Sequence, residues 1–317
     1  MLDVANRLYE IFAGRTDSHG QDTGDGSGGM RVDAPVTPQL IRQHLDGAVG
    51  VGIYPTWHQH HFDSDEPTLM ASWGCCDIDT GDWSEAYGLA TALRAMGIVP
   101  HIERSRSKGW HIWVFPTDPV EAKVMRRALK VAYAAIELPA KEANPKQETL
   151  NVGQVGNYVR LPYKGVGVPP GNPHKQTFMR DWSAGADGFL VPVSDWVYEF
   201  DSSFQTPATV LENWANKYRE PERGKVGVQT TMTDEQIVSL CGGLRGDLLL
   251  FVKNGPQNDR SAGMVALAHK LRAAKYGVNE AFNVLCVADE QWGGKYSNRG
   301  VQQRDRFLVD ILERAFT

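Results

Sequence analysis

Residues 75–83, CCDIDTGDW, include Asp77 and Asp79, two carboxylates that stand two positions apart. The local pattern predicts a β-strand over residues 69–79. Alternate side chains of a strand point to the same face, so Asp77 and Asp79 should project together and repel each other. One interpretation is a strand end that reaches solvent, where aspartate is harmless. The other is a carboxylate pair whose repulsion is offset by bound divalent metal ions.

A second polar segment, SRSKGWHIW at 105–113, follows one helix and one strand later. A Ser/Lys/Gly turn followed by an alternating strand would place His111 and Trp113 on one face and Ile112 on the other. Turn amides, serine hydroxyls, a lysine and a histidine together have the chemistry of a phosphate cradle. The alternative is a hairpin turn with a structural histidine. The candidate phosphate-binding residues are Ser105, Ser107, Lys108, Gly109 and His111.

A third acid is needed if two Mg²⁺ or Mn²⁺ ions are to be held by converging carboxylates. The segment KEANPKQ at 141–147 supplies Glu142, shortly before a proline that keeps the chain extended. Glu137 and Glu148 are rivals for this position, although Glu137 has the pattern of a helix end.

Cations are also grouped in the sequence. The predicted strand GNYVRLPYKG at 156–165 carries Arg160 and Lys164, which can neutralise a triphosphate. Arg104 and Arg106, in the basic segment before the Ser/Lys/Gly turn, are candidate contacts to a nucleic-acid backbone.

Helices and strands alternate around these segments, which indicates an α/β (α+β) domain followed by helices only. Helices are predicted over residues 37–45, 84–97 and 118–138, with a hairpin of strands at 99–105 and 110–116, and a loop over 169–181 that returns to a strand near residue 190. The predicted organisation is an N-terminal helix and flexible loop (1–29, with the loop at 17–29), a catalytic domain (30–216), a linker (217–232) and a small helical domain (233–317).

Composition limits the classes of protein that fit. The chain has 317 residues, a formal net charge of −5 and 42% hydrophobic residues, which is typical of a soluble globular protein without a uniformly basic surface. We expect no membrane-spanning helix, and four cysteines without a CxxC pair favour the cytoplasm. The segment HQHH at 58–61 has no cysteine nearby, so no zinc site is expected. The sequence contains no GxxxxGK[ST] motif, so a helicase partner would be a separate protein.

Four segments, in this order and spacing, resemble the motifs of the archaeo-eukaryotic primase superfamily. Their closest resemblance is to the primase-polymerases of phages, plasmids and related mobile elements, and it covers roughly residues 30–200. It implies a catalytic core with an RRM-like mixed β-sheet flanked by helices, and the helical tail resembles the small all-α domain that often follows. The matching segments are Asp77-Ile78-Asp79, Ser105 to Trp113, Glu142 to Gln147, and Gly156 to Lys164.

The resemblance also implies roles for single residues. Asp77, Asp79 and Glu142 would hold two divalent metal ions, Mg²⁺ or Mn²⁺. His111 would contact the triphosphate of an incoming nucleotide, and the other implied nucleotide contacts are Ser105, Ser107, Lys108, Gly109, Asn157, Arg160 and Lys164. Two features depart from the family pattern: the third acid is often aspartate in relatives, and many relatives carry a zinc-binding insertion that this sequence lacks.

The implied function is that of a DNA primase or primase-polymerase. Such an enzyme makes or extends primers from NTPs or dNTPs on single-stranded DNA, here during phage or mobile-element replication in a bacterial host cytoplasm. The alternatives are a gap-filling polymerase that cannot start a primer, a catalytically inactive nucleic-acid-binding replisome module, and a metal-dependent nuclease. In the helical domain, the segment at 293–300 could contact the template through charge and base stacking, or it could be an ordinary interhelical loop. Its candidate residues are Lys295, Tyr296 and Arg299.

Overall fold

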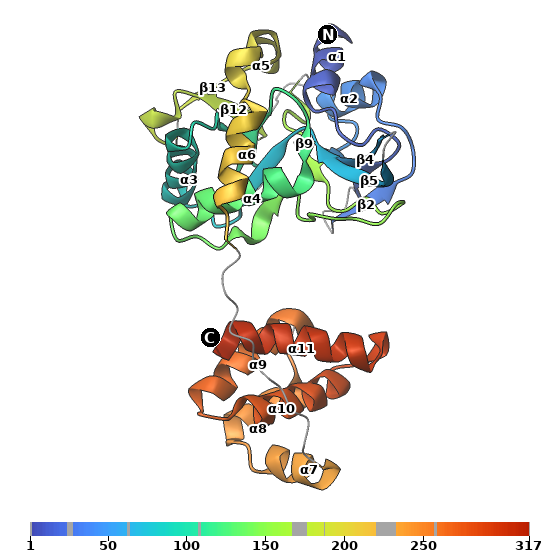
Figure 1. The fold of residues 1–317 in the computed structure, drawn as a ribbon, viewed down its shortest axis with the longest axis vertical. Helices are drawn as coiled ribbons and strands as arrows, with labels where there is room; N and C mark the ends of the chain where they lie inside the picture. The colour runs from blue at the N-terminus through green and yellow to red at the C-terminus, as the bar shows by residue number, and fades with distance from the viewer. Residues whose placement is uncertain are drawn as a thin grey trace. The chain divides into compact units, whose positions relative to one another are not determined.

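The computed structural model describes residues 2–23, 28–61, 64–106, 109–166, 176–186, 188–219, 233–256 and 259–316. The chain divides into two compact units, residues 1–219 and residues 220–317 (Figure 1). Each unit has its own hydrophobic core, so each is described by itself.

The first unit is built on a six-stranded sheet with the order β10-β6-β8-β7-β12-β13, and its described ladders are all antiparallel. Helices α3 and α4 make the connections β6-α3-β7 and β8-α4-β10, each of which skips over one strand. This is the split βαβ arrangement of an RRM-like fold, and it confirms the α/β class predicted from the sequence. The bounds are β6 Gly74–Ile78, α3 Trp83–Ala95, β7 His101–Arg104, β8 Trp110–Val114, α4 Ala122–Ala135, β10 Ala143–Asn144, β12 Thr177–Arg180 and β13 Phe189–Leu190.

Alternate residues of strand β8 face two different hydrophobic cores. Trp110, Ile112 and Val114 lie in the core that includes α3 and α4, whereas Trp113 packs into a second core on the opposite face. The predicted alternation of this strand is therefore confirmed. His111 lies on the same face as Trp113, because side chains two residues apart share a face.

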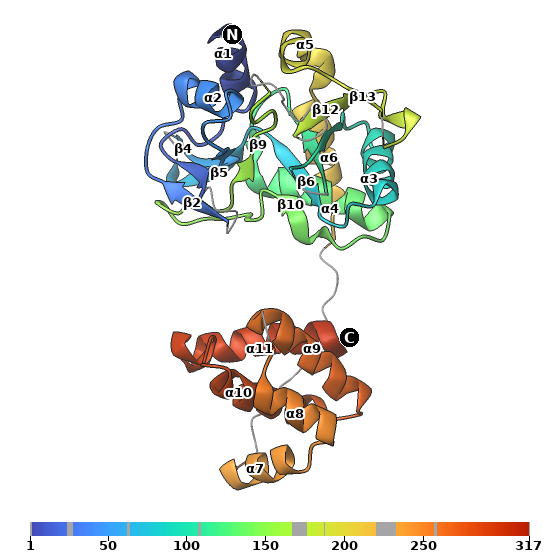
Figure 2. The same cartoon turned by 180° about the vertical axis from the view of Figure 1, so that it is seen from behind.

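The second core of this unit joins the central sheet to a smaller sheet with the order β11-β3-β1-β2. Aromatic rings dominate it: Phe12, for example, meets Trp113 edge-on with ring centroids 5.0 Å apart. Figure 2 shows α1 and α2 beside this part of the unit. The bounds are α1 Leu2–Ile11, β1 His19–Asp22, β2 Gly29–Val32, α2 Pro38–Leu45, β3 Val51–Ile53, β11 Val159–Arg160 and α5 Val193–Glu199.

The remaining elements of the unit cover its edges. A third sheet has the order β4-β5-β9, and α6 packs along α4. The bounds are β4 Thr56–His61, β5 Ser64–Ala71, β9 Val120–Glu121, α6 Ala208–Lys217, and the short 3-10 helices η1 Ala140–Glu142, η2 Trp182–Ala184 and η3 Ser202–Phe204.

Two loops expected from the sequence contain strands instead. The predicted flexible loop 17–29 holds β1, whose residue Gly20 pairs with Gly52 of β3. The predicted loop 169–181 holds β12, which pairs with β7. The Gly and Pro content of both segments favoured loops, but ladder hydrogen bonds to neighbouring strands override such local preferences.

The second unit consists of helices in its described part. Thr233 and Gln236 form the capping box that the sequence predicted at the start of α7. The bounds are α7 Asp234–Gly242, α8 Gly246–Asn254, α9 Arg260–Ala273, α10 Val278–Gln291, η4 Ser297–Arg299 and α11 Val301–Phe316. In the described parts of both units, no helix is long and apolar enough to cross a membrane.

Candidate active site

Three ionisable side chains form a row across the central sheet. The ladder of β6 and β8 places Asp77 opposite His111, and the ladder of β8 and β7 places His111 opposite Glu103. Opposite residues of antiparallel strands share a face. His111 Nδ1 lies 2.9 Å from Glu103 Oε2, and His111 Nε2 lies 3.7 Å from Asp77 Oδ1. His111 is therefore hydrogen-bonded to Glu103 through Nδ1, and its Nε2 faces the carboxylate of Asp77.

A cavity of about 110 Å³ opens beside this row. It lies where the central sheet, the η1–β10 segment and the β11 segment meet. Its lining residues are Asp77, His111, Glu142, Asn144, Lys146, Asn157, Tyr158, Val159 and Arg160. The cavity brings together five residues that the sequence predicted for one site, namely Asp77, His111, Glu142, Asn157 and Arg160.

The carboxylates of the site lie close enough to affect one another. Burial raises the pKa of Asp77, and the charges of Asp79 and Glu142 add to this rise, while His111 and Lys146 oppose it. Asp77 is the penultimate residue of β6, and its side chain is 29% exposed. Asp79 lies beyond the end of β6 in an exposed turn.

Glu142 is the candidate third acid that the structure places at the cavity. Its carboxylate makes an ion pair with Lys146, which lines the same cavity. Glu148 pairs with Arg127, Nη2 to Oε2 2.9 Å, and with Lys130 instead.

The other rival acid, Glu137, is exposed just beyond α4. Neither it nor Glu148 is among the residues that line the cavity, so the geometry favours Glu142.

The chemistry of these donors fits a hard divalent cation. Carboxylate oxygens are the ligands that Mg²⁺ and Mn²⁺ prefer. Burial, and after it the negative charges of Asp79 and Glu142, raises the pKa of Asp77, and a cation would offset that negative charge. Among the described residues, however, no three acidic, histidine or cysteine side chains are grouped tightly enough to hold a metal ion. The expected three-carboxylate cluster is therefore not preassembled. Mg²⁺ is usually bound by one or two carboxylates together with water and substrate phosphates, and the two carboxylates at the cavity, Asp77 and Glu142, match that number.

Glu103 is a functional candidate that the sequence analysis missed. Its side chain is buried, and Oε2 accepts hydrogen bonds from His111 Nδ1 at 2.9 Å and from Trp113 Nε1 at 2.6 Å. Burial alone lowers the pKa of His111, but the charge and hydrogen bond of Glu103, together with Asp77, outweigh burial and raise it. A charged residue at an inward position of a predicted strand was the signal that could have identified Glu103.

The β7–β8 hairpin turn positions the start of β8. Ser105 donates its backbone N–H to the carbonyl of Gly109 at 3.0 Å, and Ser105 is buried. Arg104 stacks over the ring of Trp110 at 5.4 Å, so its side chain belongs to the sheet surface. The predicted phosphate contacts Ser107 and Lys108 lie outside the described residues.

Gly109 has a steric role in this turn. A Cβ atom at this position would lie 2.3 Å from the carbonyl oxygen of Ile78 and 3.3 Å from Cα of Asp79. Only glycine therefore lets the hairpin approach the end of the strand that carries Asp77.

Replacing Gly109 with alanine should displace the hairpin from the end of β6. We expect a loss of about 1–3 kcal/mol in the free energy of unfolding, because a backbone carbonyl must move to admit the methyl group. Urea unfolding followed by tryptophan fluorescence measures this loss. Gly153→Ala tests positive backbone φ without crowding, since nothing lies within 4 Å of a Cβ there. Equal losses in both variants would contradict the steric explanation.

Three cations converge on Asp22, a residue the sequence analysis placed in a loop. Arg160 Nε lies 2.7 Å from Oδ1, Arg106 Nη1 lies 2.9 Å from Oδ2, and Lys164 Nζ lies 3.5 Å from Oδ2. The Asp22 side chain is only 6% exposed. One carboxylate thus fixes three cations and leaves a local excess of positive charge, and one of those cations, Arg160, lines the cavity.

Asp22 should make the free energy of unfolding of the first unit depend on pH. Burial raises the pKa of Asp22, but the hydrogen bond and charge of Arg160, with Arg106 and Lys164, outweigh burial and hold it below the usual value. Its contribution is therefore present above the unfolded pKa of about 4 and is lost as the pH falls through the lower folded pKa.

Asp22→Asn should lower the free energy of unfolding at pH 7 by roughly 2 kcal/mol, and this difference should shrink below pH 4. Denaturant unfolding at both pH values measures it. Asp33→Asn is the matched control, because its carboxylate is 72% exposed and pairs with Arg31 at the surface, where an ion pair contributes at most about 1 kcal/mol. A difference that stays constant with pH would contradict the role given to Asp22.

Tyr158 is a second residue of the cavity that the sequence analysis did not select. Its ring lies against the small sheet, where a Cβ at Gly20 or Gly52 would come within 2.4 Å of ring carbons. The ring meets Tyr54 edge-on at 5.7 Å between centroids. Because Gly20 and Gly52 have no side chains, the ring of Tyr158 can pack directly on the backbone of the two neighbouring strands. Tyr158 lines the cavity together with Arg160. Its neighbour Asn157 accepts a hydrogen bond from Gln147 at 2.7 Å.

In the second unit, burial of Tyr296 argues against the base stacking predicted for the segment at 293–300. Tyr296 is 7% exposed in the core of that unit, and its hydroxyl hydrogen-bonds Ser261 Oγ, so it has no free face for a base. Lys295 also contacts Ser261. Arg299 is exposed and lies over the ring of Phe307 at 5.5 Å. The sequence showed an aromatic residue between two cations, but it did not show that Tyr296 packs in the core of the helical unit.

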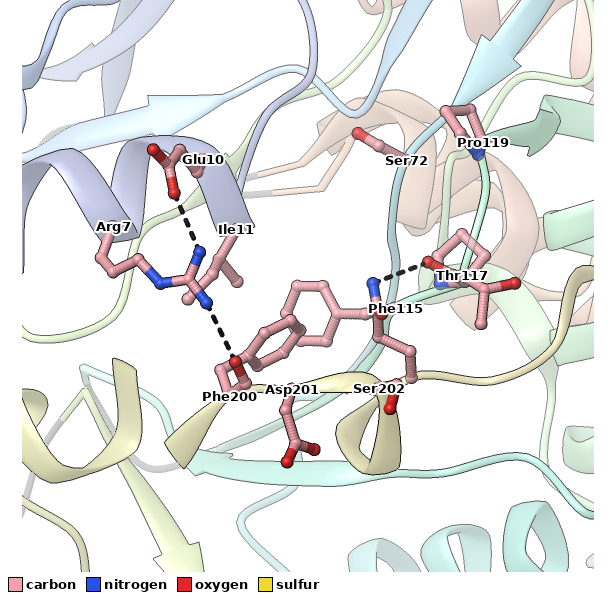
Figure 3. A pocket seen from close by; sticks show the side chains of 12 residues that line it. Arg7, Glu10, Ile11, Ser72, Phe115, Thr117, Pro119, Phe200, Asp201 and Ser202 are labelled. Carbon is pink, nitrogen blue, oxygen red and sulfur yellow. Dashed lines mark hydrogen bonds and ion pairs between the residues drawn. The ribbon is translucent and has the colours of Figure 1, made fainter. Parts of the chain in front are cut away.

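A larger cavity of about 330 Å³ lies elsewhere in the first unit (Figure 3). Arg7 spans its wall and donates to the Glu10 carboxylate and to the carbonyl of Phe200. None of the residues predicted for the active site lines it. We therefore place the chemistry at the smaller cavity, where the ionisable side chains are.

Comparison with known families matches residues 27–173 to the family described as "TOTE conflict system, Archaeo-Eukaryotic Primase domain". The matched range contains all five predicted residues of the small cavity. A comparison with curated proteins found no match.

Solved structures with a similar chain include the following three. The polymerase domain of Mycobacterium tuberculosis Ligase D, in complex with DNA, is 14% identical, with 69% of this chain and 92% of that chain covered and a TM-score of 0.38. Primase RepB' is 11% identical, with 99% and 94% covered and a TM-score of 0.36. The corresponding domain of the cyanophage S-2L primase-polymerase is 15% identical, with 51% and 90% covered and a TM-score of 0.30. Residues 27–173, a little under half of the chain, are therefore similar to an archaeo-eukaryotic primase domain.

Proposed function

We propose that the chain is a DNA primase-polymerase that transfers nucleotides from NTPs or dNTPs to a growing strand on a single-stranded DNA template. The family match supports the class of reaction. The observation that carries the proposal is the charge pattern of one cavity, where Asp77 and Glu142 meet His111 and Arg160. Carboxylates for a divalent cation beside cations for a polyphosphate are the parts that phosphoryl transfer needs.

In this proposal, Asp77 and Glu142 hold Mg²⁺ or Mn²⁺, with Asp79 close by. When bound, the cation supplies Lewis-acid stabilisation of the negative charge on the reacting phosphate. Arg160 offers its guanidinium to the phosphates from a position fixed by Asp22. His111 presents Nε2 to the cavity from the floor of the sheet. Lys146 neutralises Glu142 until substrate and metal arrive.

A synthesis assay with and without a primer tests the proposal. It uses single-stranded DNA, all NTPs and dNTPs with one labelled, and either Mg²⁺ or Mn²⁺. Labelled oligonucleotides without a primer would support a primase, and extension only from an added primer would support a gap-filling polymerase. DNA binding with no product in either format would contradict the proposal and support an inactive nucleic-acid-binding module. The proposal also includes a phage or mobile-element origin and a separate helicase as partner.

A further inference from the structure

We infer that Glu103 is the positioning residue of the active site: it holds the His111 ring so that Nε2 faces the nucleotide cavity. This inference rests on the proposed function for the identity of the ligand, a nucleoside triphosphate. Its structural part concerns only the two side chains and their hydrogen bonds.

The first step is the cost of burying Glu103. The side chain is 0% exposed, and its Oε2 accepts two hydrogen bonds, from His111 and Trp113. Its other oxygen, Oε1, has no hydrogen-bond partner within the described part of the chain. A buried carboxylate with an unpaired oxygen is expensive, and an apolar side chain of similar size would stabilise the sheet more. Stability alone therefore does not account for a carboxylate at this position.

The second step is what Glu103 does to the histidine. An imidazole that donates Nδ1–H to a carboxylate has a fixed ring orientation, and in its neutral form the proton is on Nδ1. His111 lines the cavity and Nε2 is turned toward Asp77 at 3.7 Å, a distance too long for a hydrogen bond. Nε2 is therefore the ring atom left to meet a ligand in the cavity, and it donates to a phosphate oxygen when the ring carries a proton on both nitrogens.

The third step is rigidity. Glu103, His111 and Asp77 are consecutive cross-strand partners on the central strands β7, β8 and β6. Trp113 fixes the same Glu103 oxygen from two residues along β8 and packs in the aromatic core. The carboxylate is thus held by strand register and by an indole, so it can orient His111 without help from a loop.

The test combines a spectroscopic signature with a double-mutant cycle. Histidine labelled with ¹⁵N reports which ring nitrogen of His111 carries the proton, and the signal is assigned by its absence in His111→Gln. We expect protonated Nδ1 in the wild type and in Trp113→Phe, which keeps the aromatic packing. Glu103→Leu should shift the neutral ring to the Nε2–H form. A neutral His111 ring that carries its proton on Nε2 and none on Nδ1 in the wild type would overturn the inference.

The cycle uses nucleotide incorporation by folded variants, checked by thermal melting. Glu103→Gln should lower kcat/KM on the order of 10-fold, as is typical when the partner of a functional histidine is changed. In the His111→Ala background the same change should have no further effect, because Glu103 acts through the histidine. An equal loss in both backgrounds would overturn the inference in favour of a structural role. Because the NMR result needs no activity, an inactive wild type with protonated Nδ1 would count against the proposed function while supporting the positioning role.

Discussion

Replacing Asp77 with asparagine should reduce template-directed nucleotide incorporation by roughly 1,000-fold or more, since a metal ion contributes several kcal/mol of charge stabilisation and each 1.4 kcal/mol is tenfold in rate. The change removes one oxygen charge without changing the size of the side chain. It also removes a charge that is costly here, because burial and, after it, the charges of Asp79 and Glu142 raise the pKa of Asp77. The variant should therefore fold at least as stably as the wild type while losing activity. Primer extension at saturating Mn²⁺, beside a thermal melt, measures both effects.

The sequence offers a matched control five residues away. Asp82 is exposed, and its carboxylate accepts the N–H of Ser84 at 2.8 Å as the N-cap of α3. Asparagine caps helices as well as aspartate does. Asp82→Asn should therefore retain full activity and stability. If Asp77→Asn and Asp82→Asn were equally active, Asp77 would not be the metal-binding carboxylate.

The second large effect is expected at His111. His111→Ala should lower kcat/KM for the incoming nucleotide by about 10- to 100-fold, because a hydrogen bond to a charged group contributes about 1.5–3 kcal/mol. The loss should appear mainly in the KM for the nucleotide, since the proposed contact is to the triphosphate. Steady-state incorporation with varied dNTP concentration separates KM from kcat.

A variant of His101 is the control for His111→Ala. It lies on the neighbouring strand β7 and is partly buried. Desolvation lowers its pKa to about 4, and Nε2 hydrogen-bonds the carbonyl of Phe204 at 2.7 Å. His101→Gln should change stability but leave the KM for nucleotide unaltered. A KM that is unchanged in His111→Ala as well would contradict the proposed triphosphate contact.

The parts of the site that the sequence could predict depend on patterns within a few neighbouring residues of the chain. Alternation along residues 110–114 placed His111 and Trp113 on one face, and the strand before residue 80 placed Asp77 at a strand end. The motifs pointed to a primase family because several of them occur in the expected order along the chain. Asp79 was harder to place, because strand β6 ends at Ile78 and the period of two stops there.

The parts that could not be predicted depend on contacts between distant segments. Asp22 was read as a loop residue, yet strand pairing of β1 brings it to Arg160, which is far away in the sequence. Glu103 looked like one acid in a basic segment, and only the ladder with β8 shows that it reaches His111. Tyr296 had the composition of a template contact, but burial in the helical core is a property of the whole unit. Local patterns cannot supply partners that the fold brings together.

The most direct test of the central claim is where Mn²⁺ binds in crystals grown with a nucleoside triphosphate and a primer–template whose end cannot be extended. Anomalous scattering locates the ion without relying on turnover. The account predicts Mn²⁺ bound by Asp77 and Glu142, with the nucleotide phosphates facing His111 and Arg160. A nucleotide bound in this protein with its Mn²⁺ away from Asp77 would contradict the account.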